Sequence, residues 1–399
     1  MSCQDRIIDK KELTNYTAFS KIETMNAIEL TKTLIGYDTV SPNSNVEVMD
    51  FLTDTLESVG CEVERVEYND PAGVLKVNLI GRKGRNTKKR GLALLGHIDT
   101  VPAIGWSENP FEARIVGDKM YGRGSCDMKG SVACMIEVAS RYSLSQLDAP
   151  LYVVITADEE VGYFGASAVE EKSEMFKQYG FPQYGVVGEP TELKAVYAHK
   201  GAVRFSVTAH GRAAHSSTGE GDNATLKLIP FLSEMREIHQ ELTTDPQYFN
   251  SEFTPPFTDW NITISDGECT ANITSPKSVC NINYRPMPGD EPQVWIDRGR
   301  ESAGKHGLEF DLFINAGPVR TPPDAEIIQA ALEITGDTKP HTVAYSTDAA
   351  VFSKHMETVI IGPGSILQAH TVDEWMALDQ FEKGSNIFSQ FVDRFCVSS

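Results

Sequence analysis

Histidines and acidic residues recur at several distant points of the chain, each after a strand-like run or before a helical one. His97 ends the run 92–97 and is followed two residues later by Asp99. The other candidates are Asp127, Glu159, Glu160, Glu189 and His370. Imidazole and carboxylate groups together suit divalent cations, and a carboxylate near a bound histidine usually orients it. This pattern favours a metal site, although a surface histidine after a strand and a solvated acidic turn are the alternatives for His97 and for the Glu159-Glu160 pair.

Two histidines with several carboxylates are enough ligands for two cations. One carboxylate can bridge the pair, while each cation keeps one histidine and one terminal carboxylate. Two cations roughly 3.5–4 Å apart can activate a water near neutral pH and polarise a carbonyl. Because Glu159 adjoins a candidate ligand on the same loop, it cannot easily bind the same ions, so we predict that it is the general base.

The segments that carry these residues read as a largely parallel sheet covered by helices. The runs 92–97, 151–156, 184–187 and 358–361 are short and apolar, as expected of strands buried on both faces. Residues 46–59 and 131–142 have helical patterns. Open α/β sheets place their sites beyond the carboxyl ends of such strands, where the candidate ligands stand.

A second domain is predicted within the first. Residues 203–209, 259–265 and 278–284 read as strands, and 223–242 and 298–307 as helices, which predicts an inserted α+β domain at 201–312. The catalytic domain would then comprise 1–200 and 313–399. Pro230 should kink or restart the helix at 223–242, and the polar residues 1–22 are expected to form a loosely attached extension.

Composition narrows the partners and the compartment. The net charge of −20 argues against nucleic acid and anionic membranes as partners. No stretch approaches the ~18 apolar residues of a membrane span, and the polar start lacks the apolar core of a signal peptide. Seven scattered cysteines suit free thiols in a reducing compartment, so we expect a cytoplasmic protein.

As a set, these motifs resemble the co-catalytic zinc amidohydrolases of the M20 metallopeptidase family. The segments that carry the resemblance are Gly96-His97-Ile98-Asp99, Asp127-Met128-Lys129-Gly130, Asp158-Glu159-Glu160, Gly188-Glu189-Pro190-Thr191 and Ala369-His370-Thr371-Val372-Asp373-Glu374. The resemblance implies a di-zinc aminopeptidase-like α/β catalytic domain, and a ferredoxin-like lid through which two copies form a homodimer.

The resemblance also implies a distribution of the ligands. One cation would be held by His97, Asp127 and Glu189, and the other by Asp127, Glu160 and His370, with Asp127 bridging. The cations implied are zinc, with cobalt as the alternative. Asp99 would support His97, and Glu159 would act as the base.

Within the family, the chain most resembles acetylornithine deacetylases, which implies a small N-acyl amino acid as substrate. The segments concerned are 188–191, 198–201, 284–289 and 362–370. By the same resemblance His215 would stabilise the oxyanion from across the dimer. Arg285 and Asn272 would bind the substrate carboxylate, although the segment 271–276 departs from the usual pattern around Asn272. Gly364 is also predicted to bind the substrate.

Asp348 is the candidate that bears on the side chain of the substrate. The resemblance to acetylornithine deacetylases implies that it could face the ammonium group of ornithine, and the alternative is that it caps a helix at 349–355. Acetylcitrulline deacetylase, succinyl-diaminopimelate desuccinylase, aminoacylase and dipeptidase activities are the alternatives with the same chemistry. A binding protein that kept the fold is the alternative without catalysis.

Overall fold

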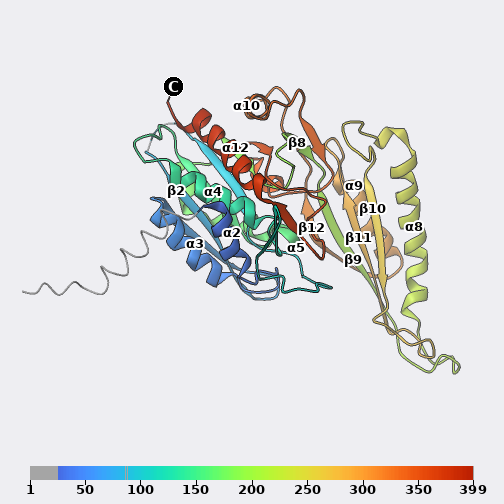
Figure 1. Cartoon of the computed structure of the whole chain (residues 1–399). Helices are drawn as coiled ribbons and strands as arrows, with labels where there is room; N and C mark the ends of the chain where they lie inside the picture. Colours follow the sequence, from blue (N-terminus) through green and yellow to red (C-terminus); the bar gives the residue numbers. More distant parts are fainter. Residues whose placement is uncertain (1–25, 86, 88, 399) are drawn as a thin grey trace, which may run out of the picture. The chain divides into compact units, whose positions relative to one another are not determined.

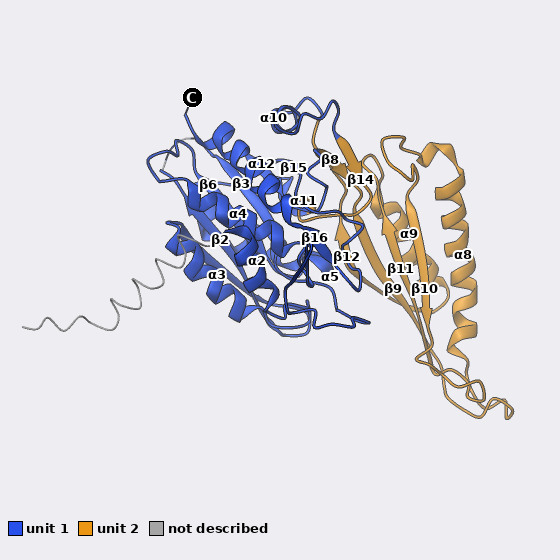
Figure 2. Ribbon diagram, viewed as in Figure 1, with its two compact units in different colours: residues 1–195, 323–340, 351–399 blue, residues 196–322, 341–350 orange. Residues whose placement is uncertain are grey.

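A computed structural model describes residues 26–85, 87 and 89–398 of the chain. These residues form two compact units, shown in different colours in Figure 2. Unit 1 comprises the described residues within 26–195, 323–340 and 351–398, and unit 2 comprises 196–322 and 341–350. The extension expected at 1–22 lies outside the described residues.

Unit 1 is built on a mixed, largely parallel sheet, as the sequence predicted. Its strands follow the order β1-β2-β6-β3-β7-β15. The parallel part pairs β3 with β6 and β7, and β7 with β15, while β2 runs antiparallel to both of its neighbours. The bounds are β1 Glu62–Asn69, β2 Leu75–Lys83, β3 Leu92–His97, β6 Leu151–Thr156, β7 Tyr184–Val187 and β15 Glu357–Ile360.

Helices cover this sheet, as Figure 1 shows. Helices α4 and α12 pack against each other and against β3, whereas α3 and α6 pack on β1 and β2. Every residue of β3 and β6 is buried, so both faces of these central strands are covered. The helices of unit 1 are α2 Ala27–Ile35, α3 Val46–Ser58, α4 Lys129–Arg141, α5 Glu159–Gly162, α6 Phe164–Lys172, α7 Glu174–Tyr179, α10 Glu326–Thr335 and α12 Leu378–Cys396.

A small antiparallel sheet in unit 1 joins the segment before Asp127 to the segment after His370. Strand β5 (Lys119–Tyr121) pairs with β4 (Arg114–Val116) on one side and with β16 (Trp375–Ala377) on the other. Distant parts of the chain are thereby fixed side by side.

Unit 2 contains a ferredoxin-like βαββαβ arrangement. Its elements are β9 Ala202–His210, α8 Ala224–Thr244, β10 Asp259–Ser265, β11 Lys277–Arg285, α9 Pro292–Lys305 and β12 Glu309–Ala316. The antiparallel sheet has the order β10-β11-β9-β12. Its core lies between the sheet and the two helices, around Phe205, Phe231 and Trp260.

The rest of unit 2 extends beyond this arrangement. Strand β8 (Val196–His199) pairs with β13 (Val319–Arg320), and it pairs in parallel with β14 (His341–Val343). This pairing attaches the segment 341–350 to unit 2. The short helices are η1 Pro246–Tyr248 and α11 Ala349–Phe352, the latter at the sequence boundary between the units.

One of the two outcomes expected at Pro230, a restart of the helix, is not found in unit 2. Helix α8 runs through Pro230 without restarting. Pro230 and Leu226, whose carbonyl loses its usual N–H partner, are both exposed, so water can satisfy that carbonyl. No helix among the described residues has the length and apolar character needed to cross a membrane.

Candidate metal centre

Five predicted ligands come together in unit 1 from five separate segments. His97 is the last residue of β3, and Asp127 lies just before α4. Glu160 belongs to α5, which follows β6. Glu189 and His370 lie on the segments that follow β7 and β15. The carboxyl ends of the parallel strands therefore supply most of the site, as expected for this kind of sheet.

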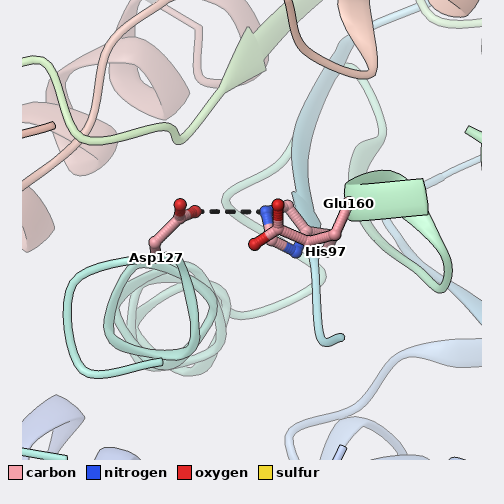
Figure 3. A group of neighbouring side chains, drawn as sticks. All are labelled: His97, Asp127 and Glu160. Atoms are coloured by element: carbon pink, nitrogen blue, oxygen red, sulfur yellow. Dashed lines mark ion pairs between the residues drawn. The ribbon is translucent and has the colours of Figure 1, made fainter. Parts of the chain in front are cut away.

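Asp127 lies between the two imidazoles. Its Oδ1 is 3.3 Å from Nε2 of His97, and its Oδ2 is 3.3 Å from Nε2 of His370. Figure 3 shows the first of these contacts, with Glu160 beside it. Each carboxylate oxygen thus faces a different histidine, which is the geometry that a bridging ligand requires.

The remaining two carboxylates divide between the histidines. Glu189 Oε1 lies 3.7 Å from Nε2 of His97, whereas Glu160 Oε2 lies 3.1 Å from Nε2 of His370. One ligand atom from each of His97, Asp127 and Glu160 can be chosen so that all three lie within 4.8 Å of one another. The side chains therefore form two overlapping groups that share Asp127.

The cluster carries an excess of negative charge in a buried place. His97, Asp127 and Glu189 are at most 6% exposed. Burial alone would lower the pKa of His97, but its hydrogen bonds to Asp127 and Asp99 raise the pKa well above its ordinary value. Hydrogen bonds to Asp127 and Glu160 raise the pKa of His370 to about 10.

The pKa values of the carboxylates also reflect the excess of negative charge in the cluster. Burial, and then the charge of Asp127, raises the pKa of Glu160. Burial would also raise the pKa of Asp127, but contacts with His370 and His97 outweigh it and hold that pKa below its ordinary value. A cluster that attracts protons so strongly needs positive charge, and imidazole nitrogens with carboxylate oxygens are suitable donors for divalent transition metals. The residues present therefore fit a pair of such cations.

Asp99 contacts His97, but mainly through its backbone. Nδ1 of His97 lies 3.0 Å from the carbonyl oxygen of Asp99 and 3.5 Å from its carboxylate. A carbonyl oxygen only accepts, so the neutral ring carries its proton on Nδ1. The lone pair of Nε2 then faces Asp127, which is the state in which a histidine binds a metal.

The carboxylate of Asp99 has a further role that the sequence did not reveal. Its Oδ1 accepts the N–H of Glu159 at 3.1 Å, and its Oδ2 accepts the N–H of Glu160 at 3.3 Å. The hydroxyl of Ser41 also donates to Oδ2, at 2.8 Å. Asp99 therefore fixes the backbone of both the predicted base and a predicted ligand. Nothing in the type or spacing of Ser41 marked it in advance.

The predicted base follows a strained residue. Asp158 has φ 57°, in the left-handed region that L residues rarely adopt. Its carboxylate accepts the hydroxyl of Tyr68 at 2.7 Å and lies 3.1 Å from Nζ of Lys76. These buried contacts hold the turn between β6 and α5. Glu159 itself is 8% exposed and close enough to His97 for its charge to raise the pKa of that histidine.

Gly364 is required by packing. Its φ is 88°, and a Cβ at this position would lie 2.6 Å from Sγ of Cys126. Its carbonyl accepts the N–H of Glu192, and its own N–H donates to Gln380. These contacts place it in unit 1 near the segment that carries Asp127.

His215 and Asn272 lie on adjacent loops of unit 2. The backbone of His215 bridges to Ile273, and the N–H of Ser216 donates to the carbonyl of Asn272. Nδ1 of His215 accepts the N–H of Ser217. In the neutral ring the proton is therefore on Nε2, so the exposed His215 is a hydrogen-bond donor at that atom.

Arg285 lies at the opposite end of unit 2 from these loops. It is the last residue of β11, whereas the loops of His215 and Asn272 adjoin the region before Lys277, the first residue. The nine residues of β11 span roughly 26 Å from Lys277 to Arg285, at about 3.3 Å per step. The structure therefore does not bring Arg285 together with His215 and Asn272 within one chain.

Asp348 is 2% exposed, in the segment that follows β14. The hydroxyl of the preceding Thr347 accepts the N–H of Ala349 at the start of α11. Asp348 and Arg285 both belong to unit 2, whereas the five predicted ligands and Glu159 belong to unit 1.

Comparison with known proteins agrees with this architecture. The chain is 32% identical over 385 residues to an acetylornithine deacetylase of Myxococcus xanthus, covering 94% of this chain and 99% of that one. It is 30% identical over 387 residues to an acetylornithine deacetylase of Proteus mirabilis, with 94% and 97% covered.

Solved structures show the same fold. An M20 family metallo-carboxypeptidase from Sulfolobus solfataricus has a TM-score of 0.73 at 16% identity, with 92% of this chain and 99% of that chain covered. Human carnosine dipeptidase 1 has a TM-score of 0.72 at 17% identity, with 94% and 98% covered. The model of peptidase family M20/M25/M40 matches residues 93–394. The chain therefore belongs to peptidase family M20/M25/M40.

Proposed function

We propose that this chain is a metal-dependent amidohydrolase that converts N2-acetyl-L-ornithine to L-ornithine and acetate, in arginine biosynthesis. The observation that carries the proposal is the position of Asp127, with one oxygen toward His97 and the other toward His370. The relatives named acetylornithine deacetylase, which match nearly the whole chain, support the choice of substrate.

The five clustered residues would hold two divalent cations, which we propose to be zinc, with cobalt as the alternative. His97, Asp127 and Glu189 would form one group of ligands, and Glu160 and His370 would complete the other with Asp127. Bound cations would polarise the amide carbonyl and make a water acidic enough to lose its proton near neutral pH.

Glu159 would serve as the general base. Its backbone is fixed by Asp99 through the same carboxylate that fixes Glu160, so base and ligand keep a constant spacing. Glu159 would take the proton from the attacking water and later return it to the nitrogen of the leaving amine. A carboxylate 8% exposed beside His97 is well placed to hold that proton.

Residues of unit 2 would bind the substrate. The guanidinium of Arg285 suits the α-carboxylate, with Asn272 as a further polar contact. Nε2–H of His215 would donate to the developing oxyanion. Asp348 would face the side-chain ammonium of ornithine, and backbone at Gly364 would line the site.

We further propose that the enzyme is a homodimer in which each lid completes the other subunit's site. Roughly 26 Å of strand separates Arg285 from the loops of His215 and Asn272, which is too far for one acylated amino acid to bridge. Strand β10 is an edge of its sheet and carries Ile264, which is 52% exposed. On helix α8, packed beside it, Leu226 and Ile229 are 63% and 54% exposed. A second copy paired edge to edge would cover these side chains.

A cytoplasmic location is part of the same proposal. All six cysteines among the described residues are free, which suits a reducing compartment.

A substrate panel tests the proposed activity. Release of acetate or succinate would be measured for N2-acetyl-L-ornithine, N2-acetyl-L-citrulline, N-succinyl-diaminopimelate and a neutral N-acetyl amino acid, with hydrolysis of a dipeptide alongside. We expect the highest kcat/KM for acetylornithine. An equal or higher value for acetylcitrulline would contradict the proposed recognition of the ammonium group.

A variant tests the base. Glu159→Gln should lower kcat by about 10²–10⁴-fold while the protein still binds two cations. Glu57→Gln, an exposed carboxylate on α3, is the matched control and should keep full activity. Ordinary turnover by Glu159→Gln would show that another group takes the proton.

A further inference from the structure

Glu374 is a completely buried carboxylate that contacts the segment carrying Asp127. It is 0% exposed, and its Oε1 accepts the backbone N–H groups of Cys126 at 2.8 Å and of Asp127 at 3.0 Å. The backbone carbonyl of Glu374 also accepts the N–H of Gly122. One glutamate thus fixes both ends of the turn that presents Asp127.

Arg123 completes this arrangement from the other side. Its Nη1 lies 2.7 Å from Oε2 of Glu374, and only 2% of the residue is exposed. Its Nη2 donates to the carbonyl of Thr371 at 3.2 Å and to the carbonyl of Pro102 at 3.3 Å. Thr371 directly follows His370, and Pro102 lies on the segment that leaves His97.

The ion pair therefore connects the three segments that carry Asp127 and the two histidines. Neither side chain faces the cluster as a ligand, because the oxygens of Glu374 are occupied by N–H groups and by Arg123. A buried ion pair is a weak source of stability, since both charges lose their hydration. Its hydrogen bonds to the segments that carry Asp127, His97 and His370 point to a role in positioning these residues.

We propose that Arg123 and Glu374 are positioning residues that hold Asp127 and His370 at the spacing needed to share cations. The inference rests on the proposed metal centre and deepens it. Groups that orient metal ligands typically contribute 10–100-fold to metal affinity. The pair would act through backbone groups: it fixes the N–H of Asp127 and the carbonyl of Thr371, and hence the directions of the two ligand side chains.

The test is a titration of the full-length, metal-depleted protein with Co²⁺, in the absence of substrate. Calorimetry gives the affinities, and the visible absorption of bound Co²⁺ reports the ligand geometry. In Glu374→Gln, one amide oxygen cannot replace two carboxylate oxygens, so an NH₂ group must face either Arg123 or the backbone N–H groups. In Arg123→Lys the charge is kept, but the fork that reaches Thr371 and Pro102 is lost.

Glu64→Gln is the matched control. The carboxylate of Glu64 accepts the N–H groups of Glu174 and Met175 at the start of α7, together with the hydroxyl of Ser173. It therefore has the same kind of contacts, but none of them is to a predicted ligand segment.

We expect Glu374→Gln and Arg123→Lys to bind at least one Co²⁺ about 10–100-fold more weakly with an altered spectrum, whereas Glu64→Gln binds like the wild type. Affinities within twofold of the wild type in both variants would overturn the inference, as would an equal loss in Glu64→Gln. If Glu374→Gln does not fold, Arg123→Lys decides the question alone. A wild-type protein that binds two Co²⁺ but hydrolyses nothing would refute the proposed function and leave this inference intact.

Discussion

Two inactive variants should restore activity when they are mixed as subunits. Arg285 ends β11, whereas the loop of His215 adjoins the segment before the start of that strand, so we propose that one subunit supplies Arg285 and the predicted ligands while its partner supplies His215. Glu159→Gln removes the base from its own subunit's site. His215→Ala removes the oxyanion donor from the site of the other subunit.

The expected recovery follows from counting sites. In a mixed dimer, the site on the His215→Ala subunit keeps Glu159 and receives an intact His215 from its partner. The second site lacks both groups. Random reassociation of equal amounts makes half of the molecules mixed dimers, each with one functional site in two, so activity should return to about a quarter of the wild type in a symmetric dimer.

The recovery is large compared with the background. Loss of a general base costs about 10²–10⁴-fold, and loss of one oxyanion donor costs about 10²–10³-fold. Each variant alone should therefore keep about 1% or less of the wild-type activity.

The assay is acetate release from N2-acetyl-L-ornithine after mild dissociation, mixing and reassociation. Each variant treated alone is the control, and light scattering checks the dimer. If the mixed sample stays at the background of the separate variants while dimers have formed, His215 acts within its own chain and the reasoning from β11 is wrong.

Three other predictions concern the metal site and the pH dependence of stability. In Asp99→Asn an NH₂ group must face the N–H of Glu159 or Glu160. Leaving that donor unsatisfied costs about 1–3 kcal/mol, so the free energy of unfolding measured in urea should fall by about that amount, and an unchanged value would argue against the role of Asp99 in fixing these residues. Removal of cations with a chelator should lower the rate of acetate release by more than about 100-fold, and added Zn²⁺ or Co²⁺ should restore it. Full activity in protein that elemental analysis shows to be free of metal would refute the metal mechanism. Burial lowers the pKa of His199 to about 4, so between pH 6.5 and 4 the unfolded chain binds a proton that the folded chain does not, and stability falls on acidification by up to about 3 kcal/mol. His199→Asn keeps a donor for the carbonyl of Lys200 but does not titrate. As the pH falls from 7 to 4, its free energy of unfolding in urea should therefore decrease less than that of the wild type, and an equal decrease in both proteins would contradict this assignment.

The predicted ligands are the part of the site that the sequence indicates most clearly. Each of them is a histidine or an acid after a strand-like run or before a helical one, and the fold of the sheet brings strand ends together whatever their distance in sequence. The same patterns predicted the largely parallel sheet, because Leu92–His97 and Leu151–Thr156 are too short and too apolar to be surface helices.

The supporting residues were harder to find. Ser41 donates to Asp99 from a segment with no distinctive pattern, and the partner of Arg123 lies 251 positions away. Such contacts depend on tertiary packing, so no local spacing encodes them. Glu374 stands in a motif that was recognised, but its role appears only from the N–H groups that it accepts.

Helix α8 shows the limit of a general rule. Proline is disfavoured in helices because it removes a hydrogen bond and crowds the preceding turn, and this general cost predicted a kink or a restart at Pro230, of which the restart is not found. Pro230 lies on the exposed side of the helix, which reduces that cost. Which turns of α8 are exposed depends on how the helix packs on its sheet, and the local sequence does not determine that packing.

The pairing of β7 with β15 has a consequence for how the chain acquires its structure. These parallel neighbours are separated by roughly 170 residues, and all of unit 2 lies between them in the sequence. Closing a loop of that length costs about 4–5 kcal/mol of chain entropy. If unit 2 becomes compact first, the effective loop is shorter. The order of synthesis favours this, because the sequence of unit 2 is complete before β15 exists. Strand β15 can then pair with β7 as soon as it has been synthesised, because unit 2 is already compact. Early pairing limits the time for which the edge of β7 is open to aggregation.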